Sequence, residues 1–476
     1  MYGHSLPCYL AKSPKILNSL ITSVLGITGI PSFLANSIVL SVFPFFQYIK
    51  INVFKLRLIQ LDMLKIKEAY NKVMNDSLYR NSMYLMIGTA IMSVLGFVAW
   101  AIISKIYSAE EVGLATTIIS VMGIITSFSV LGLNAGLIRF LPKSGRKNDK
   151  INTTFTLAAL VSIIVTSVFL LGLKGFSPSL LFIKQNLIYS IIFIIFMVFA
   201  TLGSLIESVF IAYRASGFVL LKNTIFSFGK MAFPFLFVSF GAYGIFGSWM
   251  LSLILGYVVV FLILIYKFAY KPKLVFYDSI IEKIGKYSFG NYISGFIGGL
   301  PILMLPVLIT NLHHPELTAY FYMAMMVANV LFIIPNATTS SLFAEGSNNE
   351  KALGEQIKKA IKIISWLIIP AIIITIFIGK YVLLFFGNDY SIEGYGFLQV
   401  LAFSGIFISI NSVFGAILRV KKKIGTMIIM NIINTGVILL ASYFLVKEGF
   451  GLWGVGIAWI SGQALVSLIY FAFLRK

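Results

Sequence analysis

The chain has 476 residues, of which 59% are hydrophobic and only 11% are charged, which excludes an ordinary soluble protein and indicates an integral membrane protein. The 37 Lys and Arg residues outnumber the 16 Asp and Glu residues and give a formal net charge of +21. One Cys and three His residues exclude a disulfide framework and leave almost nothing from which to build a zinc site, so no metal site is expected.

The N-terminal segment is the least regular part of the sequence. Residues 16–49 are apolar but interrupted by prolines, and residues 50–74 are basic with apolar residues at helical spacing. We expect residues 1–75 to be an N-terminal extension with an amphipathic interfacial helix, preceded by one extra span or a short hairpin. A start codon assigned too early, with the true start near Met74 or Met83, is an equal alternative.

From Met83 onward the chain contains twelve apolar stretches of the length that a spanning helix needs, which is roughly 20 residues. These stretches are continuous rather than alternating, so helices are predicted instead of a β-barrel. The expected fold class is therefore an all-α polytopic membrane protein. The predicted helices are residues 83–104, 112–137, 153–173, 186–212, 219–240, 245–266, 289–311, 317–342, 361–379, 395–418, 424–446 and 453–473.

The basic residues alternate between the predicted loops. With the segment before Met83 placed inside, 31 of the 37 Lys and Arg residues lie on the inner side, 5 lie in outer loops, and Lys230 lies within a helix. Because Lys and Arg collect on cytoplasmic loops and meet anionic lipids there, this asymmetry predicts a multi-pass protein of the cell (plasma) membrane with a cytoplasmic C-terminus. The positive charge therefore indicates orientation, and no nucleic-acid partner is expected.

Short motifs recur at an offset of about 206 residues, which indicates an internal repeat. Residues 107–113 match 313–319, residues 207–210 match 411–414, and residues 244–247 match 451–454. Because each copy has six helices, an even number, both copies enter the membrane in the same direction. We expect an N-lobe of helices 1–6 (76–266), a cytoplasmic connector (267–288) and a C-lobe of helices 7–12 (289–476).

Two similar six-helix lobes are typical of transporters, in which one lobe rocks against the other and exposes a central cavity to each side in turn. The alternative is a structural duplication in a membrane enzyme or scaffold.

Residues 78–120 and 131–145 resemble the start of the polysaccharide-export flippases. These Wzx-like lipid-linked oligosaccharide translocases belong to the multidrug/oligosaccharidyl-lipid/polysaccharide (MOP) exporter superfamily. The resemblance lies in an asparagine in the first helix, an acidic outer turn before a VGLAT-like helix, and an LGL motif followed by an arginine. It covers about residues 76–476, and the matching residues are Asn81, Glu110, Glu111, Gly113, Gly132 and Arg139, with glycine-rich turns at 243–247 and 450–454.

The resemblance implies a MATE-like fold and a transporter, not an enzyme, without a cofactor. The implied activity is movement of a polyprenyl-diphosphate-linked oligosaccharide from the cytoplasmic to the outer leaflet by alternating access, for surface polysaccharide or glycoprotein biosynthesis. The expected partners are this lipid-linked glycan, membrane lipids, a coupling ion (sodium or a proton) and polysaccharide assembly enzymes.

Two ionisable residues stand out because charged side chains within a membrane are costly and usually functional. Lys230 lies eight residues beyond Lys222, about 12 Å from the cytoplasmic face, and Glu207 lies about 10 Å from the same face. They are close enough in depth to meet as a structural ion pair. Alternatively, Lys230 binds the diphosphate and Glu207 acts as a proton-linked carboxylate.

Further candidates for the substrate path are cationic or polar. Arg139 lies at the predicted cytoplasmic end of the second helix, where a guanidinium group suits bidentate binding of phosphate, although an ordinary inside-positive loop is the alternative. Asn291 and Asn411 are candidate cavity residues at membrane depth, although such residues more often form hydrogen bonds between helices. Other polar residues at membrane depth are Asn329, Asn336, Asn431, Asn434 and Gln463.

Two other functions compete with the flippase. A cation-coupled multidrug exporter prefers a buried acid, for which Glu207 is the best candidate. A membrane-embedded glycan ligase or polymerase needs a substantial outer loop, whereas the predicted outer loops are short.

Overall fold

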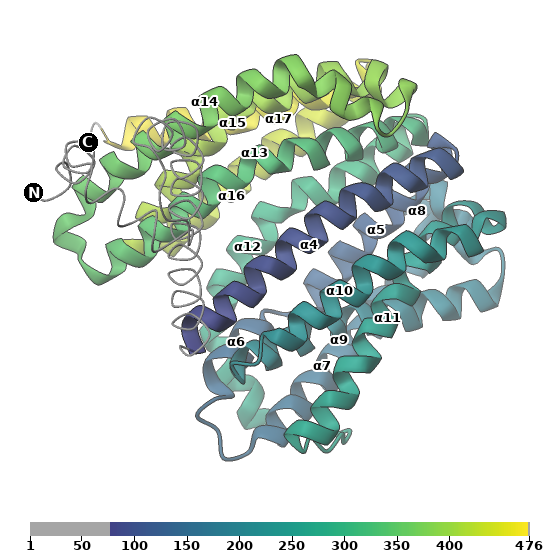
Figure 1. Ribbon diagram of the computed structural model, residues 1–476, viewed down its shortest axis with the longest axis vertical. Coiled ribbons are helices and arrows are strands. Elements are labelled where there is room, and N and C mark those ends of the chain that lie inside the picture. The colour runs from purple at the N-terminus through teal and green to yellow at the C-terminus, as the bar shows by residue number, and fades with distance from the viewer. Residues whose placement is uncertain (1–76, 475–476) are drawn as a thin grey trace, which may run out of the picture. The chain divides into compact units, whose positions relative to one another are not determined.

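A computed structural model describes the backbone of residues 77–474 and the side chains of residues 80–277 and 292–472. The predicted N-terminal extension, residues 1–75, lies outside the described residues. Residues Asn81–Lys476 form one compact unit. Throughout the described chain the regular elements are helices, and no strand occurs among them, which confirms the predicted all-α class (Figure 1).

The helices fall along the chain into two groups, which we call the first and second helix sets. The first set is α4 (Ser77–Ile106), α5 (Ala109–Val130), α6 (Leu133–Phe140), α7 (Lys147–Leu171), α8 (Leu173–Phe176), η1 (Pro178–Lys184), α9 (Leu187–Ala212), α10 (Gly217–Ala232), η2 (Phe233–Leu236), η3 (Val238–Phe240) and α11 (Gly241–Phe268). The second set is α12 (Asp278–Leu312), α13 (Pro315–Asn348), η4 (Glu350–Ala352), α14 (Leu353–Leu384), α15 (Asn388–Val420), α16 (Ile424–Lys447) and α17 (Gly451–Leu474).

Eleven helices of the described chain are long and apolar enough to cross a membrane. The remaining predicted span, residues 219–240, differs from the expectation. It consists of α10, which at 16 residues is about 24 Å long, followed by the short 3₁₀ turns η2 and η3. Helix α10 gives way to η2 just before Pro234. Proline has no backbone N–H to donate, so it ends a regular helix.

The second predicted span also differs from the expectation, because residues 112–137 do not form one helix. Helix α5 ends at Val130, and Leu131 and Gly132 follow with φ values of 50° and 73°. Two successive left-handed residues cannot continue a right-handed helix. The chain therefore turns and restarts as the short helix α6, which carries Arg139.

The acidic turn before α5 caps that helix. The Ser108 hydroxyl accepts a hydrogen bond from the Glu111 backbone N–H at 3.2 Å, and the Glu111 carboxylate accepts one from the Ser108 N–H at 2.8 Å. This reciprocal capping box satisfies backbone donors that the first helical turn leaves unpaired, and a cap of this kind stabilises a helix by about 1 kcal/mol.

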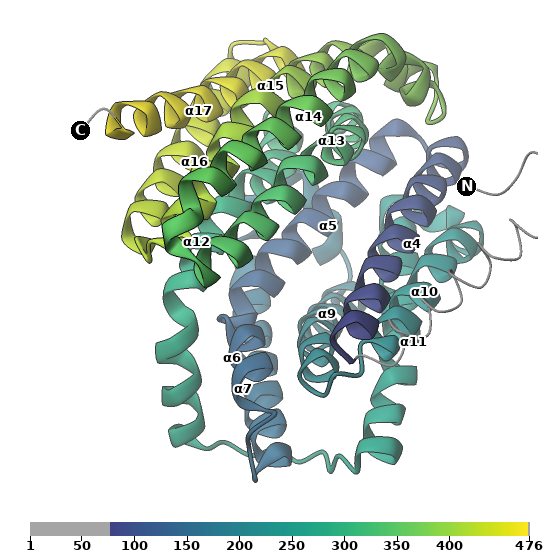
Figure 2. The ribbon, with the colours of Figure 1, turned by 60° about the vertical axis from the view of Figure 1, so that its left-hand side comes forward.

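Helix α5 joins the two helix sets, because it packs against α12 and α13 of the second set as well as α7, α9 and α11 of the first (Figure 2). The backbones of α5 and α13 come close together at Gly113, where an added Cβ would lie 1.8 Å from the Pro315 carbonyl oxygen. Small residues let helix backbones approach in this way within a membrane. Hydroxyl groups continue the contact, since Thr310 Oγ1 lies 2.6 Å from Thr117 Oγ1 and 2.7 Å from Thr318 Oγ1.

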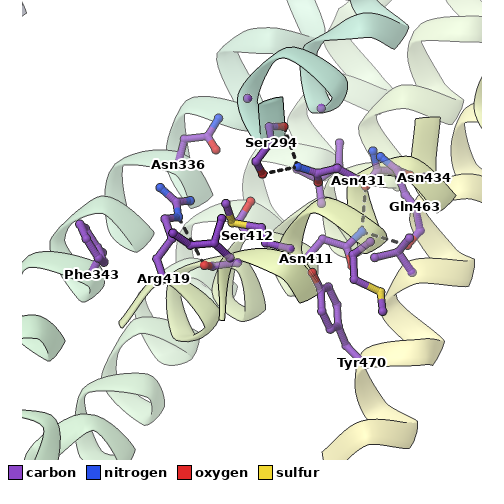
Figure 3. A pocket seen from close by; sticks show the side chains of 18 of the residues that line it. Ser294, Asn336, Phe343, Asn411, Ser412, Arg419, Asn431, Asn434, Gln463 and Tyr470 are labelled. Carbon is purple, nitrogen blue, oxygen red and sulfur yellow. Dashed lines mark hydrogen bonds between the residues drawn. The ribbon is translucent and has the colours of Figure 1, made fainter. Parts of the chain in front are cut away.

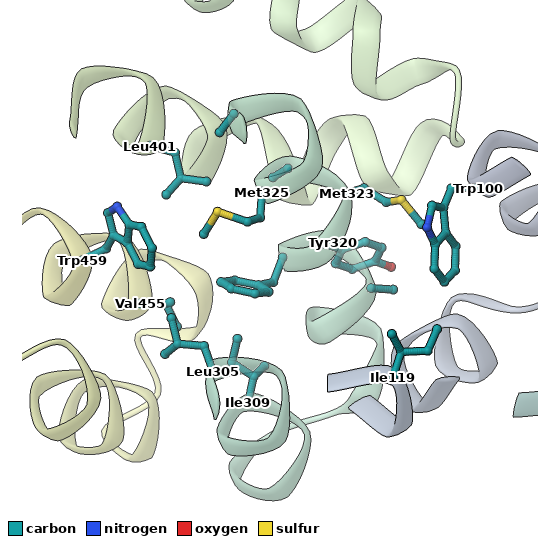
Figure 4. Packing of buried hydrophobic residues seen from close by; sticks show 14 of the residues in the cluster. Trp100, Ile119, Leu305, Ile309, Tyr320, Met323, Met325, Leu401, Val455 and Trp459 are labelled. Atoms are coloured by element: carbon teal, nitrogen blue, oxygen red, sulfur yellow. The ribbon is translucent and has the colours of Figure 1, made fainter. Parts of the chain in front are cut away.

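Apolar packing extends the contact between the sets. Helix α13 carries buried residues from Tyr320 to Met325, and Figure 4 shows them between Trp100 and Ile119 on one side and Leu401, Val455 and Trp459 on the other. The Trp100 ring lies 5.1 Å from the Tyr322 ring and 5.7 Å from the Trp249 ring. Helix α13 therefore packs against both helix sets.

Candidate functional site

The second helix set contains a polar cavity of about 790 Å³, within the size range of ligand pockets. Its walls come from α12, α13, α15, α16 and α17, and Figure 3 shows the side chains that line it. Five of the polar residues that the sequence places at membrane depth meet here. The polar and charged lining residues are Ser294, Asn336, Asn411, Ser412, Arg419, Lys422, Asn431, Asn434, Gln463 and Tyr470.

Hydrogen bonds between helices fix three of the carboxamides in the cavity wall, those of Asn411, Gln463 and Asn431. The Asn411 side-chain amide donates to Gln463 Oε1 at 2.8 Å and to the Gln463 carbonyl oxygen at 3.0 Å, while Ser467 Oγ donates to Asn411 Oδ1 at 2.9 Å. The Asn431 amide donates to the carbonyl oxygen of Ser294 at 2.9 Å and to its hydroxyl oxygen at 3.0 Å. These bonds hold polar groups in defined positions within apolar helices, as a binding site requires.

Two cations lie at one end of the cavity, at the end of α15 and in the turn after it. Arg419 is two helical turns beyond Asn411, about 12 Å along the axis. Its Nε donates to the Gly415 carbonyl oxygen at 3.3 Å, and its guanidinium carbon lies 5.9 Å from the centre of the Phe343 ring. Lys422 follows in the turn between α15 and α16. Positive charge therefore lies at this end and carboxamides lie farther along the helices.

Lys230 lies in the first helix set, on α10, and is only 5% exposed. Its Nζ is 4.9 Å from the centre of the Phe226 ring and 5.2 Å from that of Trp249. Among the residues whose side chains are described, no acidic group forms an ion pair with Lys230. Aromatic faces stabilise a desolvated ammonium group by about 2 kcal/mol or more, so the two rings account for how it is accommodated.

Glu207 forms an ion pair with Lys222 and not with Lys230, so of the two alternatives for these charges the structure does not contain the ion pair between Lys230 and Glu207. The Lys222 side chain is 11% exposed and that of Glu207 is 35% exposed. Glu207 lies on α9 and Lys222 on α10, so the ion pair links these two helices. The depth estimate from sequence was insufficient because residues at similar depth on neighbouring helices can point in different directions.

Arg139 is exposed near the end of α6, and its guanidinium carbon lies 5.6 Å from the centre of the Phe140 ring. It is not among the residues that line the cavity in the second set. In the following loop, a hydrogen bond from Arg146 Nε to Asp149 at 2.7 Å raises the pKa of the Arg146 guanidinium. This basic segment is therefore separate from the cavity lining.

The candidates from the sequence thus lie in different places. Asn411 lines the cavity, whereas Lys230, Glu207 and Arg139 belong to the first helix set. Asn291 is part of helix α12, and the structure does not describe its side chain.

The sequence analysis did not single out Arg419 and Lys422, because both count among the inside-positive residues. The signal that could have revealed Arg419 is its spacing of two helical turns after Asn411, one residue beyond the end of the predicted helix 395–418.

Comparison with known proteins identifies related sequences and folds. A model of the family described as polysaccharide biosynthesis protein matches residues 102–393, which is more than half of the chain. No curated protein matches the sequence.

Three similar solved structures show the same fold. One is an inward-facing multidrug resistance MATE family transporter of the MOP superfamily, with a TM-score of 0.66 and 16% identity over 84% of this chain and 97% of that one. Another is the lipid II flippase MurJ in an inward closed conformation, with a TM-score of 0.64 and 14% identity over 82% and 87% of the two chains. A third is a MOP superfamily transporter from Pyrococcus furiosus, with a TM-score of 0.56 and 15% identity over 84% and 94%. The expected MATE-like fold is therefore confirmed.

Proposed function

The chain belongs to the polysaccharide biosynthesis protein family of membrane transporters in the MOP superfamily, and we propose that it flips a polyprenyl-diphosphate-linked oligosaccharide from the cytoplasmic to the outer leaflet. The product would supply surface polysaccharide or glycoprotein biosynthesis. Beside the family match, one observation supports the proposal. It is the cavity lined by carboxamides, with cations at one end, among helices that are long enough to span a membrane.

The physical problem of flipping accounts for such a cavity. A diphosphate and a series of sugar hydroxyls cannot cross hydrocarbon unaided, because each unsatisfied polar group costs several kcal/mol. A flippase lowers this cost by offering hydrogen-bonding and cationic groups to the head of the substrate while the prenyl tail stays in lipid. The cavity offers these groups from side chains such as Asn411, Asn431 and Arg419.

Alternating access is the proposed mechanism, with residues 76–266 and 289–476 as the two moving lobes. We propose that Lys230 contacts the diphosphate and that Arg139 attracts it at the cytoplasmic entrance. A sodium ion or a proton drives the cycle in this proposal, and polysaccharide assembly enzymes supply and receive the glycan. The excess of Lys and Arg in the inner segments supports a cytoplasmic C-terminus in the cell membrane.

Two observations make the competing functions weaker. The acid that a cation-coupled multidrug exporter would use, Glu207, is ion-paired with Lys222. A glycan ligase or polymerase would need large outer loops for its catalytic groups, whereas only His313 and His314 separate α12 from α13. The proposed function therefore includes no covalent chemistry.

Complementation tests the proposal. The full chain is expressed in a strain that lacks its own flippase and is supplied with the glycosyltransferases for a surface polysaccharide. Restored surface glycan and loss of the accumulated lipid-linked intermediate are expected. Export of hydrophobic drugs without any restoration of glycan would instead identify a multidrug exporter.

A further inference from the structure

A second, smaller cavity of about 270 Å³ lies in the first helix set. Its walls come from α7, α9 and α11, and the chain after α11, from Tyr270 to Leu274, contributes the rest of the lining. Figure 2 shows this chain passing the start of α7 on its way to α12. No residue of the second helix set is among the described lining residues, so this cavity is separate from the carboxamide-lined one.

Four aromatic rings line this cavity. The Tyr270 ring centre lies 6.3 Å from that of Phe155 and 5.9 Å from that of Phe261, and the Phe261 ring stacks on Tyr257 at 5.4 Å. No Asp or Glu is among the described lining residues. The cavity is also smaller than the roughly 300–1,000 Å³ of pockets that take drug-sized ligands. It therefore suits a narrow apolar chain better than a hydrated group of sugars.

The helix faces beside the cavity are apolar and exposed. Leu160 on α7 is 49% exposed, and Val258 and Leu262 on α11 are 41% and 45% exposed. Both helices are long and apolar enough to span a membrane, so these side chains meet hydrocarbon. The deepest lining residue on α7, Ala159, lies about 18 Å from the start of that helix, which is close to half the thickness of a bilayer. The cavity therefore borders the lipid of a single leaflet.

Asn152 fixes the chain at the basic end of the cavity. This residue is only 2% exposed. Its Oδ1 accepts hydrogen bonds from the Tyr270 hydroxyl at 2.5 Å and from the Lys273 backbone N–H at 3.1 Å, and its Nδ2 donates to the Lys271 carbonyl oxygen at 2.9 Å. One buried carboxamide thus holds the backbone of both lysines beside the cavity.

The side chains of these two lysines are available to an anion. Lys271 and Lys273 are exposed, and Lys273 lines the cavity. The ion pairs of the described side chains include neither lysine. Each Lys or Arg next to a membrane strengthens binding of anionic lipid about fivefold, so the charge at this end of the cavity matches a phosphate group.

We propose that this cavity binds one acyl chain of an anionic phospholipid, and that Lys271 and Lys273 bind the phosphate group of that lipid. The lipid lies in the leaflet at the basic end of α7, which is the cytoplasmic leaflet in the proposed orientation. The apolar walls run inward from the lysines, which is the order of acyl chain and phosphate in a phospholipid. This lipid is a bound partner and not the transported substrate, so the inference does not depend on the flippase proposal.

Native mass spectrometry of the full chain measures this binding directly. The protein is purified in a neutral detergent, stripped of lipid, and titrated with phosphatidylglycerol or with phosphatidylcholine that has the same acyl chains. The first phosphatidylglycerol is expected to bind at least about fivefold more tightly than the first phosphatidylcholine. A third titration, with a polyprenyl phosphate, shows whether the cavity instead takes the lipid carrier of a glycan.

Matched charge variants locate the preference. The pair Lys271→Gln with Lys273→Gln is expected to remove the preference for phosphatidylglycerol. The pair Lys421→Gln with Lys423→Gln removes the same charge from exposed residues outside this cavity and should keep the preference.

A steric pair of variants tests the space itself. Ala159→Phe places a ring in the cavity and is expected to weaken binding of the first phosphatidylglycerol at least about fivefold, because the acyl chain loses its place. Leu160→Phe is the control, since the neighbouring Leu160 is exposed and lies outside the lining. The charge variants decide the question if Ala159→Phe lowers the melting temperature.

Equal affinity of the wild-type chain for the two phospholipids, or an unchanged preference in the Lys271→Gln, Lys273→Gln variant, would overturn the proposal. Polyprenyl phosphate that binds more tightly than phosphatidylglycerol, and loses that binding in Ala159→Phe, would overturn it as well, because the cavity would then hold the carrier lipid. Complementation tests glycan transport separately, so failure of one proposal is distinguishable from failure of the other.

Discussion

At the scale of single residues, the ion pair between Glu207 and Lys222 is predicted to stabilise the fold. Glu207→Ala leaves the largely buried Lys222 ammonium uncompensated, which should cost about 3 kcal/mol, the lower end for a broken buried pair because Glu207 is partly exposed. A lower melting temperature in detergent is the expected result. The double variant Glu207→Ala, Lys222→Ala should recover part of the loss, whereas additive losses would show that the pair does not couple.

Lys230 is predicted to behave in the opposite way. Lys230→Met keeps most of the side-chain volume and removes a buried ammonium that has no acidic partner among the described side chains. Because an unpaired buried charge is costly, membrane abundance should be unchanged or higher, while surface glycan display should be lost. Normal glycan display at normal abundance would remove Lys230 from diphosphate recognition and leave Arg139 as the remaining candidate in the first helix set.

At the scale of helices, the close approach of α5 and α13 is predicted to depend on Gly113. Gly113→Ala places a Cβ 1.8 Å from the Pro315 carbonyl oxygen, so the helices must separate, at a cost of about 1–3 kcal/mol or more. The melting temperature should fall. Gly247→Ala on α11 is the control, since its Cβ meets no atom within 4 Å and Ala favours a helix, so a fall of equal size there would contradict the packing explanation.

Length and hydropathy predicted most of the membrane-spanning helices. They failed where the backbone turns within a hydrophobic stretch of sequence. Residues 112–137 contain no charged side chain, so hydropathy does not register the left-handed turn at Leu131 and Gly132. The acid that opens α5 was predictable, because a capping box is a local pattern.

The cavity was harder to predict than the helices. Asn411 and Gln463 bond to each other across 52 residues of sequence, and only the packing of α15 against α17 brings them together. The predicted repeat aligns Glu207 with Asn411, yet Glu207 pairs with a lysine and Asn411 bonds to a glutamine. Equivalent positions in a repeat therefore do not determine equivalent chemistry.

At the scale of the whole molecule, the predicted orientation places both ends of the helical region in the cytoplasm. Single cysteines are introduced at exposed positions in a Cys8→Ser background and treated with an impermeant thiol reagent outside intact cells. Cysteines at Lys174 and Glu448 should react, and those at Lys143 and Lys421 should react only after the membrane is opened. Reaction of the second pair in intact cells would reverse the topology.

Transport by the purified protein is the central claim, and reconstitution tests it most directly. The full chain is placed in proteoliposomes with a fluorescent polyprenyl-diphosphate-linked oligosaccharide, and an impermeant quencher reports how much of the substrate lies in the outer leaflet. The account predicts that the quenchable fraction changes with time in the presence of the wild-type protein and stays constant with the Lys230→Met protein. A quenchable fraction that is the same with wild-type protein as in protein-free vesicles, under sodium and proton gradients alike, would contradict it.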